Sequence, residues 1–312
     1  MGIAAKRRPV CERNRQRAGE GRERSGGESP ASQGPPTGRS LPRRGSGSGG
    51  AYARKTRSRG GTTVILPYFV QSSLLRSVPG IYHAFLGVDP QPGRKDAERL
   101  QAGFSVPPSR IGTLKQVHSP TVLEWEEADA VPGGLEKRKG DALWTMISGT
   151  GVGVRTADCV PVLIAVPGVP ACAAVHAGWR GLVSGIVGET VRRLDGRFGH
   201  AAVRGLVAAA GPSARGCCYE IGEEVADQLR PLPGGERFLA RGRSAGKWTA
   251  DLTSLALEGL AAEGVPRENL EAAGPCTVCS PGFHSYRREK TLAGRQLSFI
   301  YIVGYPPTGD FP

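Results

Sequence analysis

The sequence contains no apolar run of the roughly 18 residues that a membrane-spanning helix needs. Its basic N-terminal residues are not followed by the apolar segment of about 7–15 residues that forms the core of an export signal. These two absences predict a soluble protein that is neither exported nor inserted into a membrane. We expect a cytoplasmic location.

The sequence also lacks a disulfide framework and a glycine loop for binding phosphate. Its seven cysteines are an odd number in a chain of 312 residues, which is long enough to form a core without cross-links, so we expect reduced thiols. The run Gly149–Val154 (GTGVGV) lacks the G-x-G-x-x-G spacing and leads into a strand-like segment. We interpret this run as a turn.

Most of the net charge of +13 lies in an N-terminal tail. Residues 1–60 contain 15 lysines and arginines against four acidic residues, whereas the rest of the chain contains 26 against 24. The tail is rich in Gly, Ser, Pro and Arg and has few large apolar residues, so we expect it to be disordered. Three interpretations of the tail are open: a translated upstream stretch with no role, an arm that contacts RNA or DNA, and a targeting segment. We favour the first.

Residues 61–312 have the composition of one globular domain. Strand-like apolar runs lie at 62–70, 112–126, 151–166, 171–179, 204–211 and 295–303. Helical patterns lie at 181–198, 219–230 and 251–264, with Asp251 as the expected N-cap of the last. Strands and helices do not alternate regularly. The order predicts a layered α/β (α+β) sandwich with mixed β-sheets, rather than a doubly wound parallel sheet.

Three potential metal ligands lie within or at the end of strand-like runs: His118, Cys159 and His176. Strand ends bring side chains to a common rim, where two imidazoles and one thiolate can hold Zn²⁺ and leave a fourth position for water or substrate. The same residues can act without metal, with Cys159 as nucleophile, a histidine as base and Asp158 or another carboxylate as its orienting partner. They can also be ordinary buried strand residues. Spacing alone leaves these alternatives open.

The other cysteines give weaker signals. Cys276 and Cys279 (CTVC) have half the spacing of a zinc ribbon, and no second C-x-x-C completes it, so we interpret them as structural or simply packed. The adjacent Cys217 and Cys218 are not expected to bond to each other, because that geometry is strained.

The remaining polar candidates are the segment 284–288 (HSYRR) and two isolated histidines. The segment is either a solvated loop or an anion-binding edge, since arginines bind phosphate in a fork. We expect His83 and His200 to be surface or packing residues.

Six segments of the globular part form an ordered set of motifs: LKQVHSPTV, DALWT, GVGVRTADCVPVLIA, AAVHAGWRGLVSGIV, GPSARGCCYEIGEEVA and CTVCSPGFHSYRREKTLAGRQLSFIYI. In this order they closely resemble the motifs of the polyphenol oxidase/laccase-domain family, the YfiH-like proteins. The resemblance covers Ile81–Val303, and its most specific parts are TADCVP and VHAGWRG.

The resemblance implies a single-domain α/β sandwich and a zinc site formed by His118, Cys159 and His176. It also implies phosphorolysis of adenosine, inosine and methylthioadenosine to the base and ribose 1-phosphate, with adenosine deaminase activity beside it. Members were earlier described as copper-dependent polyphenol oxidases, and this ligand set also suits copper. The sequence lacks the several His-x-His pairs of a multicopper chain, so we prefer zinc.

Two further roles follow from the implied chemistry. Phosphorolysis needs a cationic clamp that brings phosphate to C1′ of the nucleoside, and the candidates are Arg155, Arg180, Arg287 and Arg288. Asp158, beside Cys159, is expected to shuttle protons or, as we favour, to orient His118 or His176.

Residues 82–100 (YHAFLGVDPQPGRKDAERL) depart from the family pattern, which continues an HGF strand with an arginine and a G-G-V-S…S-L-N segment. If this segment lines the nucleoside pocket, we expect an altered substrate range or activity. The prediction is thus a zinc-dependent purine nucleoside phosphorylase. The alternatives are a copper-dependent polyphenol oxidoreductase, a metal-free hydrolase that uses Cys159, and a non-catalytic RNA-binding protein that acts through residues 1–60.

Overall fold

The structure is a computed structural model that describes residues 55–57, 63–65, 68–91, 93–126 and 134–303. Within the predicted tail it describes only strand β1 (Lys55–Arg57), which pairs antiparallel with β2 (Thr63–Ile65). The expected disorder of residues 1–54 lies outside the described residues. None of the described helices combines the length and the apolarity that crossing a bilayer requires.

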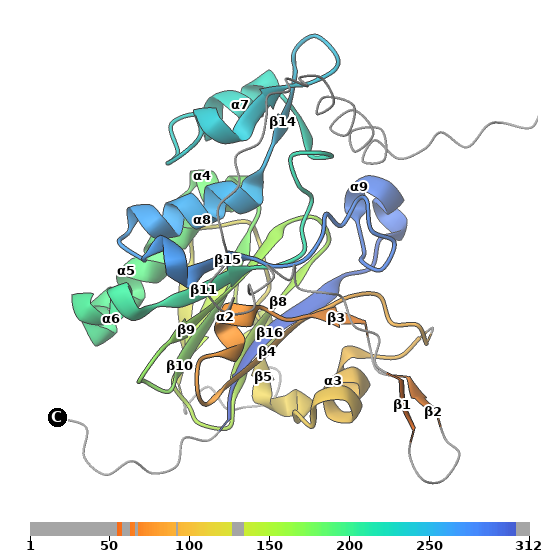
Figure 1. Cartoon of the computed structure of the whole chain (residues 1–312), viewed down its shortest axis with the longest axis vertical. Helices are drawn as coiled ribbons and strands as arrows, with labels where there is room; N and C mark the ends of the chain where they lie inside the picture. The colour runs from red at the N-terminus through yellow and green to blue at the C-terminus, as the bar shows by residue number, and fades with distance from the viewer. Residues whose placement is uncertain (1–54, 58–62, 66–67, 92, 127–133, 304–312) are drawn as a thin grey trace, which may run out of the picture.

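Two mixed β-sheets form the centre of the fold (Figure 1). The six-stranded sheet has the order β15 (Leu270–Ala272), β11 (Val207–Ala210), β9 (Val160–Val166), β10 (Ala171–Ala177), β7 (Ala142–Thr145) and β6 (Val122–Trp125). The five-stranded sheet has the order β3 (Phe69–Val70), β4 (Ile81–Leu86), β16 (Gln296–Ile302), β8 (Gly151–Thr156) and β5 (Ile111–Gly112). Parallel and antiparallel pairs occur in both sheets. The predicted layered α/β architecture with mixed sheets is confirmed.

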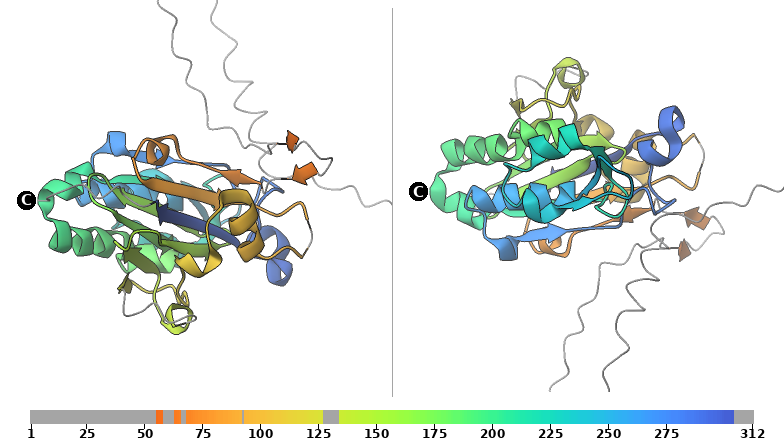
Figure 2. Two further views of the ribbon diagram at one scale, coloured as in Figure 1. Left: turned by 90° about the horizontal axis from the view of Figure 1, so that it is seen from below. Right: turned by 90° about the horizontal axis from the view of Figure 1, so that it is seen from above.

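Helices cover the outer faces of this sandwich, as Figures 1 and 2 show. The six-stranded sheet carries α5 (Ile186–Phe198), α6 (His200–Gly205) and α8 (Leu252–Ala262), and α3 (Asp96–Phe104) packs on the five-stranded sheet. The other helices within the described residues are α2 (Ser73–Arg76), α4 (Trp179–Val183), α7 (Glu223–Leu229) and α9 (Tyr286–Glu289). A third sheet joins β12 (Glu220–Gly222), β14 (Lys247–Ala250) and β13 (Leu239–Arg241). Short 3-10 turns lie at Pro108–Arg110, Leu135–Lys137, Glu236–Phe238, Arg267–Asn269 and Lys290–Leu292.

Strands β9 and β10 are buried along their whole length. Successive side chains of a strand point to opposite faces, so Leu163 and Ala165 pack between the two sheets while Val162 and Ile164 pack against the helices. This burial explains the continuous apolar run in the sequence. It also means that His176, near the end of β10, is held in a rigid part of the fold.

The expected elements differ from the structure in several places. The predicted runs 62–70 and 151–166 are each two strands, β2 with β3 and β8 with β9, and the expected turn over 149–154 is strand from Gly151 onwards. The predicted strand over 112–126 is two strands, β5 and β6, joined by a loop that contains His118 at φ 61°. The predicted helix over 181–198 is broken into α4 and α5 by Gly185, which takes φ 81°, a value that interrupts a helix. The run 219–230 begins with β12 and becomes helical only at α7.

Two smaller expectations hold. The Asp251 carboxylate caps α8 by accepting the backbone N–H groups of Thr253 and Ser254. His83 is 1 % exposed and packs within β4, and His200 lies on the surface beside Asp195.

We predict that His83 makes the stability of the protein pH-dependent. Its Nε2 accepts the backbone N–H of Ser72 at 2.8 Å, which requires the neutral ring. Burial lowers the pKa of His83 from 6.5 to about 4; Glu271 opposes this shift and Arg76 adds to it. The unfolded chain therefore takes up a proton at higher pH than the folded chain, so this contribution is complete above pH 6.5 and is lost as the pH falls towards 4.

Between pH 7 and pH 5 the loss from His83 should be about 2 kcal/mol in the free energy of unfolding. Urea denaturation at both pH values measures it, with His83→Gln as the comparison, because an amide oxygen can still accept from Ser72 and does not titrate. The variant should lose less stability than the wild type over this range. Equal losses would contradict the prediction.

Candidate active site

Three segments bring His118, Cys159 and His176 to one point. His118 lies in the loop after β5, Cys159 directly precedes β9, and His176 is the penultimate residue of β10, where it faces Pro161 of β9. Their potential ligand atoms all lie within 4.8 Å of one another. The distance from Cys159 Sγ to His118 Nε2 is 3.8 Å, and the two imidazole rings meet edge to face with centroids 4.8 Å apart. The structure therefore brings the three residues together.

Asp141, the residue before β7, accepts hydrogen bonds from both His176 and the loop that carries His118. Its Oδ1 accepts Nδ1–H of His176 at 2.8 Å and the backbone N–H of His118 at 2.9 Å. Its Oδ2 accepts the backbone N–H and the hydroxyl of Ser119 at 2.7 and 2.9 Å, and the backbone N–H of Val117 at 3.2 Å. The Asp141 side chain is fully buried. It fixes the His118 loop and leaves Nε2 of His176 for the centre.

The charges of the centre depend on these hydrogen bonds. Burial raises the pKa of Cys159, but hydrogen bonds with His118 and His176 outweigh it and lower the pKa to about 6. Burial lowers the pKa of His176, but its bonds to Asp141 and Cys159 raise the pKa to about 9. Burial acts to raise the pKa of Asp141, but hydrogen bonds from His176, Ser119 and His118 outweigh it and hold the pKa well below its usual range. The result is a thiolate beside an imidazolium–carboxylate pair.

Asp158 does not orient either histidine, which corrects the role favoured from the sequence. Its Oδ1 accepts the Thr277 hydroxyl and its Oδ2 accepts the backbone N–H of Arg287, both at 2.7 Å. Asp158 has φ 89°, so this turn holds a conformation that non-glycine residues rarely adopt. Asp158 ties the Cys159 turn to the C-terminal part of the chain, and Asp141 is the orienting carboxylate.

A pocket of about 740 Å³ opens above the three residues. The pocket is lined by aromatic side chains and by cations. The aromatic residues are Trp179, Tyr219 and Tyr286, and the cations are Arg155, Arg180, Arg287, Lys290 and Arg295. The Arg180 guanidinium lies 4.3 Å from the ring centroid of Trp179, and that of Arg287 lies 4.0 Å from the ring centroid of Tyr219. Flat apolar faces suit a planar heterocyclic base, and guanidinium groups suit a phosphate.

The four arginines proposed for phosphate binding do not share one position. Arg155, Arg180 and Arg287 line the pocket, with Arg155 paired to Asp96 of α3. Arg288 lines a different cleft, and its guanidinium donates to the carbonyls of Val278 and Ser280 at 3.2 and 3.3 Å. Arg288 therefore holds a loop and is removed from the set of phosphate ligands.

Several pocket residues escaped sequence reasoning. Asp141 opens the DALWT motif, but nothing in the local sequence shows that its carboxylate faces His176. Tyr219, Lys290 and Arg295 also line the pocket. The described residues of the divergent segment 82–100 do not line it, and Asp96 of this segment pairs with the pocket residue Arg155.

Residues 86–303 match the model of one protein family, described as multi-copper polyphenol oxidoreductase laccase. The chain belongs to this family. The match spans the strands, helices and loops that carry the His118, Cys159 and His176 centre. The matched region therefore contains the whole candidate site.

Relatives in this family are named purine nucleoside phosphorylases. The protein YlmD of Geobacillus stearothermophilus is 33% identical over 208 residues, which cover 65% of this chain and 76% of that protein. The Aquifex aeolicus enzyme is 38% identical over 188 residues, or 60% and 81% of the two chains. The protein YfiH of Escherichia coli is 32% identical over 223 residues, or 70% and 85%.

Solved structures of family members share the fold. The crystal structure of YlmD from Geobacillus stearothermophilus superposes with a TM-score of 0.66 at 25% identity, over 80% of this chain and 99% of that one. The Bacillus licheniformis protein YfiH gives a TM-score of 0.67 at 21% identity, over 76% and 97% of the two chains.

Proposed function

We propose that this chain is a zinc-dependent purine nucleoside phosphorylase. It would convert adenosine, inosine or methylthioadenosine and phosphate into the free base and ribose 1-phosphate, with adenosine deamination as a side activity and the cytoplasm as its location. The observation that carries the proposal is the convergence of His118, Cys159 and His176 beneath a pocket lined by aromatic rings and cations. The names of the relatives support the reaction class.

The donor set fits a zinc ion. His118 and Cys159 present Nε2 and Sγ 3.8 Å apart, close to the roughly 3.5 Å between neighbouring ligand atoms of a tetrahedral zinc. His176 has its Nδ1 engaged by Asp141 and so offers Nε2. Three protein ligands are typical of catalytic zinc, and the bound ion would supply Lewis acidity at the floor of the pocket.

A multicopper redox chain does not fit the ligands of the described residues. Among residues 55–57, 63–65, 68–91, 93–126 and 134–303, two groups of three or more His, Cys, Asp or Glu side chains can hold a metal. One is the centre described above, and the other contains cysteines alone. Several neighbouring histidine-rich copper sites would be needed for multicopper oxidation. This ligand inventory argues against a multicopper redox chain.

The pocket residues provide what phosphorolysis requires. Tyr219 and Trp179 offer faces for the purine, and each of these rings carries an arginine that extends into the same pocket. Arg180 and Arg287 would hold phosphate near C1′ and balance the charge that develops as the glycosidic bond breaks. Asp158, bonded to the backbone of Arg287, keeps that arginine in position.

A metal-free thiol hydrolase is the second candidate, because Cys159 lies within reach of His118 and its pKa is lowered. The two hypotheses differ in the effect of zinc. Iodoacetamide should alkylate Cys159 readily in a hydrolase of this kind, even in zinc-loaded protein. Protection of Cys159 by zinc would support the phosphorylase.

Product analysis tests the reaction class. Zinc-loaded full-length protein should release hypoxanthine from inosine only when phosphate is present, with an equal amount of ribose 1-phosphate. Free ribose formed without phosphate would instead indicate a hydrolase. Inosine and ammonia formed from adenosine would show the deaminase activity.

Replacement of Arg287 by methionine should raise the KM for phosphate by about 10-fold to 100-fold, the usual cost of losing a charge-assisted hydrogen bond. Methionine preserves the contact with Tyr219 and removes the charge. Steady-state kinetics with varied phosphate measure the change, and Arg193→Met on the exposed face of α5 is the matched control. An unchanged KM would remove Arg287 from the phosphate site.

A further inference from the structure

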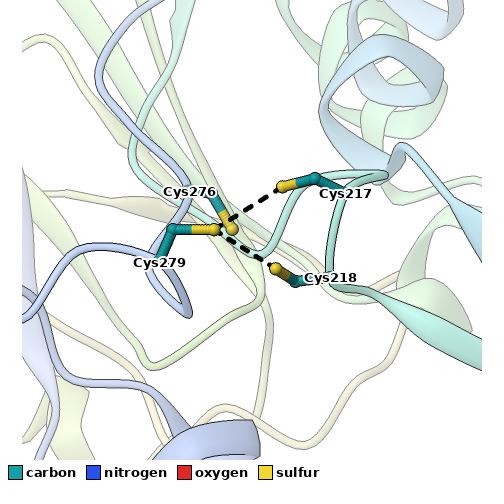
Figure 3. Close-up of side chains that lie close together, drawn as sticks. All are labelled: Cys217, Cys218, Cys276 and Cys279. Carbon is teal, nitrogen blue, oxygen red and sulfur yellow. Dashed lines mark hydrogen bonds between the residues drawn. The ribbon is translucent and has the colours of Figure 1, made fainter. Parts of the chain in front are cut away.

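Four cysteines converge at a second place in the fold (Figure 3). Cys217 and Cys218 precede β12, and Cys276 and Cys279 follow β15, so two distant segments supply two thiols each. All four Sγ atoms lie within 4.8 Å of one another. Sγ of Cys279 is 3.7 Å from Cys217 and 3.2 Å from Cys218. The six cysteines that the structure describes are not joined in disulfides.

We propose that Cys217, Cys218, Cys276 and Cys279 form a structural zinc site with four thiolate ligands. This site is separate from the His118, Cys159 and His176 centre and does not depend on the proposed nucleoside chemistry. Four protein ligands close the coordination sphere of zinc, which is typical of structural sites and leaves no position for substrate.

The spacing of the sulfurs favours zinc. Zinc–sulfur bonds of about 2.3 Å in a tetrahedron place neighbouring sulfurs about 3.8 Å apart. The distances of 3.2 and 3.7 Å and the limit of 4.8 Å for the whole set bracket this value. A four-iron cluster would hold the sulfurs farther apart, because each thiolate binds a different iron atom.

A disulfide accounts for the convergence of the four cysteines less well than a zinc ion does. Bonding of Cys218 to Cys279 would use two sulfurs and leave Cys217 and Cys276 beside them without a reason to converge. Cys217 and Cys218 are adjacent in the chain, where a disulfide is strained. A single tetrahedral ion uses all four thiols at once.

The backbone around the cysteines is arranged as it is in zinc-binding turns. The backbone N–H of Ser280 donates to the carbonyl of Cys276 at 3.1 Å and closes the C-x-x-C turn. The backbone N–H of Arg215 donates to Sγ of Cys276 at 3.5 Å.

Three arginines and Glu220 lie in the cleft beside the cluster. Four thiolates and Zn²⁺ carry a net charge of −2, which needs nearby cations when it is partly buried. Arg241, Arg243 and Arg288 line the cleft of about 610 Å³ that also contacts Cys217, Cys218 and Cys279. Arg288 also clamps the C-x-x-C turn through the carbonyls of Val278 and Ser280. The cleft gives a metal ion a path to the sulfurs.

The site would fasten two segments that reach the active-site pocket. Thr277, next to Cys276, donates to Asp158, and Tyr219, next to Cys218, lines the pocket beneath Arg287. Zinc at the four cysteines would therefore hold these two side chains in place. This consequence, unlike the metal site itself, rests on the proposed function.

Metal analysis of full-length protein purified with zinc and a reductant tests the site. We expect two zinc ions per chain in the wild type and one in Cys276→Ser/Cys279→Ser. Cys172→Ala, which removes a buried thiol outside both clusters, should keep two.

The Cys159→Ala variant keeps the test valid if the double variant fails to fold, because it leaves all four cysteines of the cluster unchanged. It should bind one ion, and its cobalt-substituted form should show the intense charge-transfer bands of a tetrathiolate site. Cys159→Ala protein that is folded but binds no metal would overturn the proposal. A disulfide between Cys218 and Cys279, found by mass spectrometry of reductant-purified wild type, would overturn it as well. Neither result depends on nucleoside turnover.

Discussion

Replacing Asp141 by asparagine is expected to weaken zinc binding at the His118, Cys159 and His176 centre, and to slow nucleoside cleavage, each by about 10-fold to 100-fold. Asp141 accepts from the His176 ring and from the backbone of the His118 loop. Asparagine keeps the shape but presents an amide group where one carboxylate oxygen accepted several donors. Both the ring of His176 and the loop of His118 would lose their anchor.

Zinc affinity is measured by competition with a chromogenic chelator, and kcat/KM for inosine is measured in zinc-saturated protein. Asp227→Asn on the exposed face of α7 is the matched control and should leave both values unchanged. Wild-type zinc affinity in folded Asp141→Asn would show that Asp141 does not organise the centre.

Replacing Gly178 by alanine should lower kcat/KM by about 100-fold, because displacing catalytic groups by about 1 Å is that costly. A Cβ at position 178 would lie 2.9 Å from Cδ2 of His118 and 3.1 Å from Sγ of Cys159. Gly178 has φ −76°, a backbone conformation that alanine adopts freely, so the conflict is purely steric. The added methyl group must push the imidazole or the thiol from its place.

Gly196→Ala is the control for this substitution, since a Cβ there has no atom within 4 Å. It lies inside α5, where alanine should add about 0.5–1 kcal/mol of stability and leave turnover unchanged. Thermal unfolding and inosine kinetics are measured for both variants. Full turnover in Gly178→Ala would contradict the close packing of the centre.

The fold could be predicted where the sequence repeats a pattern over several residues. The buried strands β9 and β10 follow from their continuous apolar runs, and α8 follows from its periodicity and its Asp251 cap. The breaks at His118 and Gly185 could not be predicted, because single residues with positive φ interrupt otherwise regular patterns there. Local patterns specify elements better than they specify the points where elements end.

The site was harder to predict because its partners meet through pairing of distant strands. Val175 of β10 lies opposite Ala142 of β7, and this register places Asp141 beside His176, 35 residues away. Asp158 is adjacent to Cys159 in the sequence, which suggests it as the orienting carboxylate, yet its carboxylate accepts the hydroxyl of Thr277. Sequence neighbours and spatial neighbours are different sets at this turn.

The cysteine cluster illustrates the same limit. The C-x-x-C of Cys276 and Cys279 is half of the proposed zinc site, and its other half lies far earlier in the chain, with Cys218 61 positions before Cys279. A short parallel bridge between Ser213 and Cys276 brings the two halves together. Without that pairing, the sequence offers no reason to join them.

We infer that phosphorolysis takes place at the His118, Cys159 and His176 centre. The most direct measurement is hypoxanthine release from inosine by zinc-loaded wild type and Cys159→Ala, with and without phosphate, with Cys172→Ala as the control for loss of a thiol. We predict phosphate-dependent release by the wild type and the control, and none by Cys159→Ala. Equal phosphate-dependent release by Cys159→Ala would contradict the claim, and so would the absence of release from folded, zinc-loaded wild type.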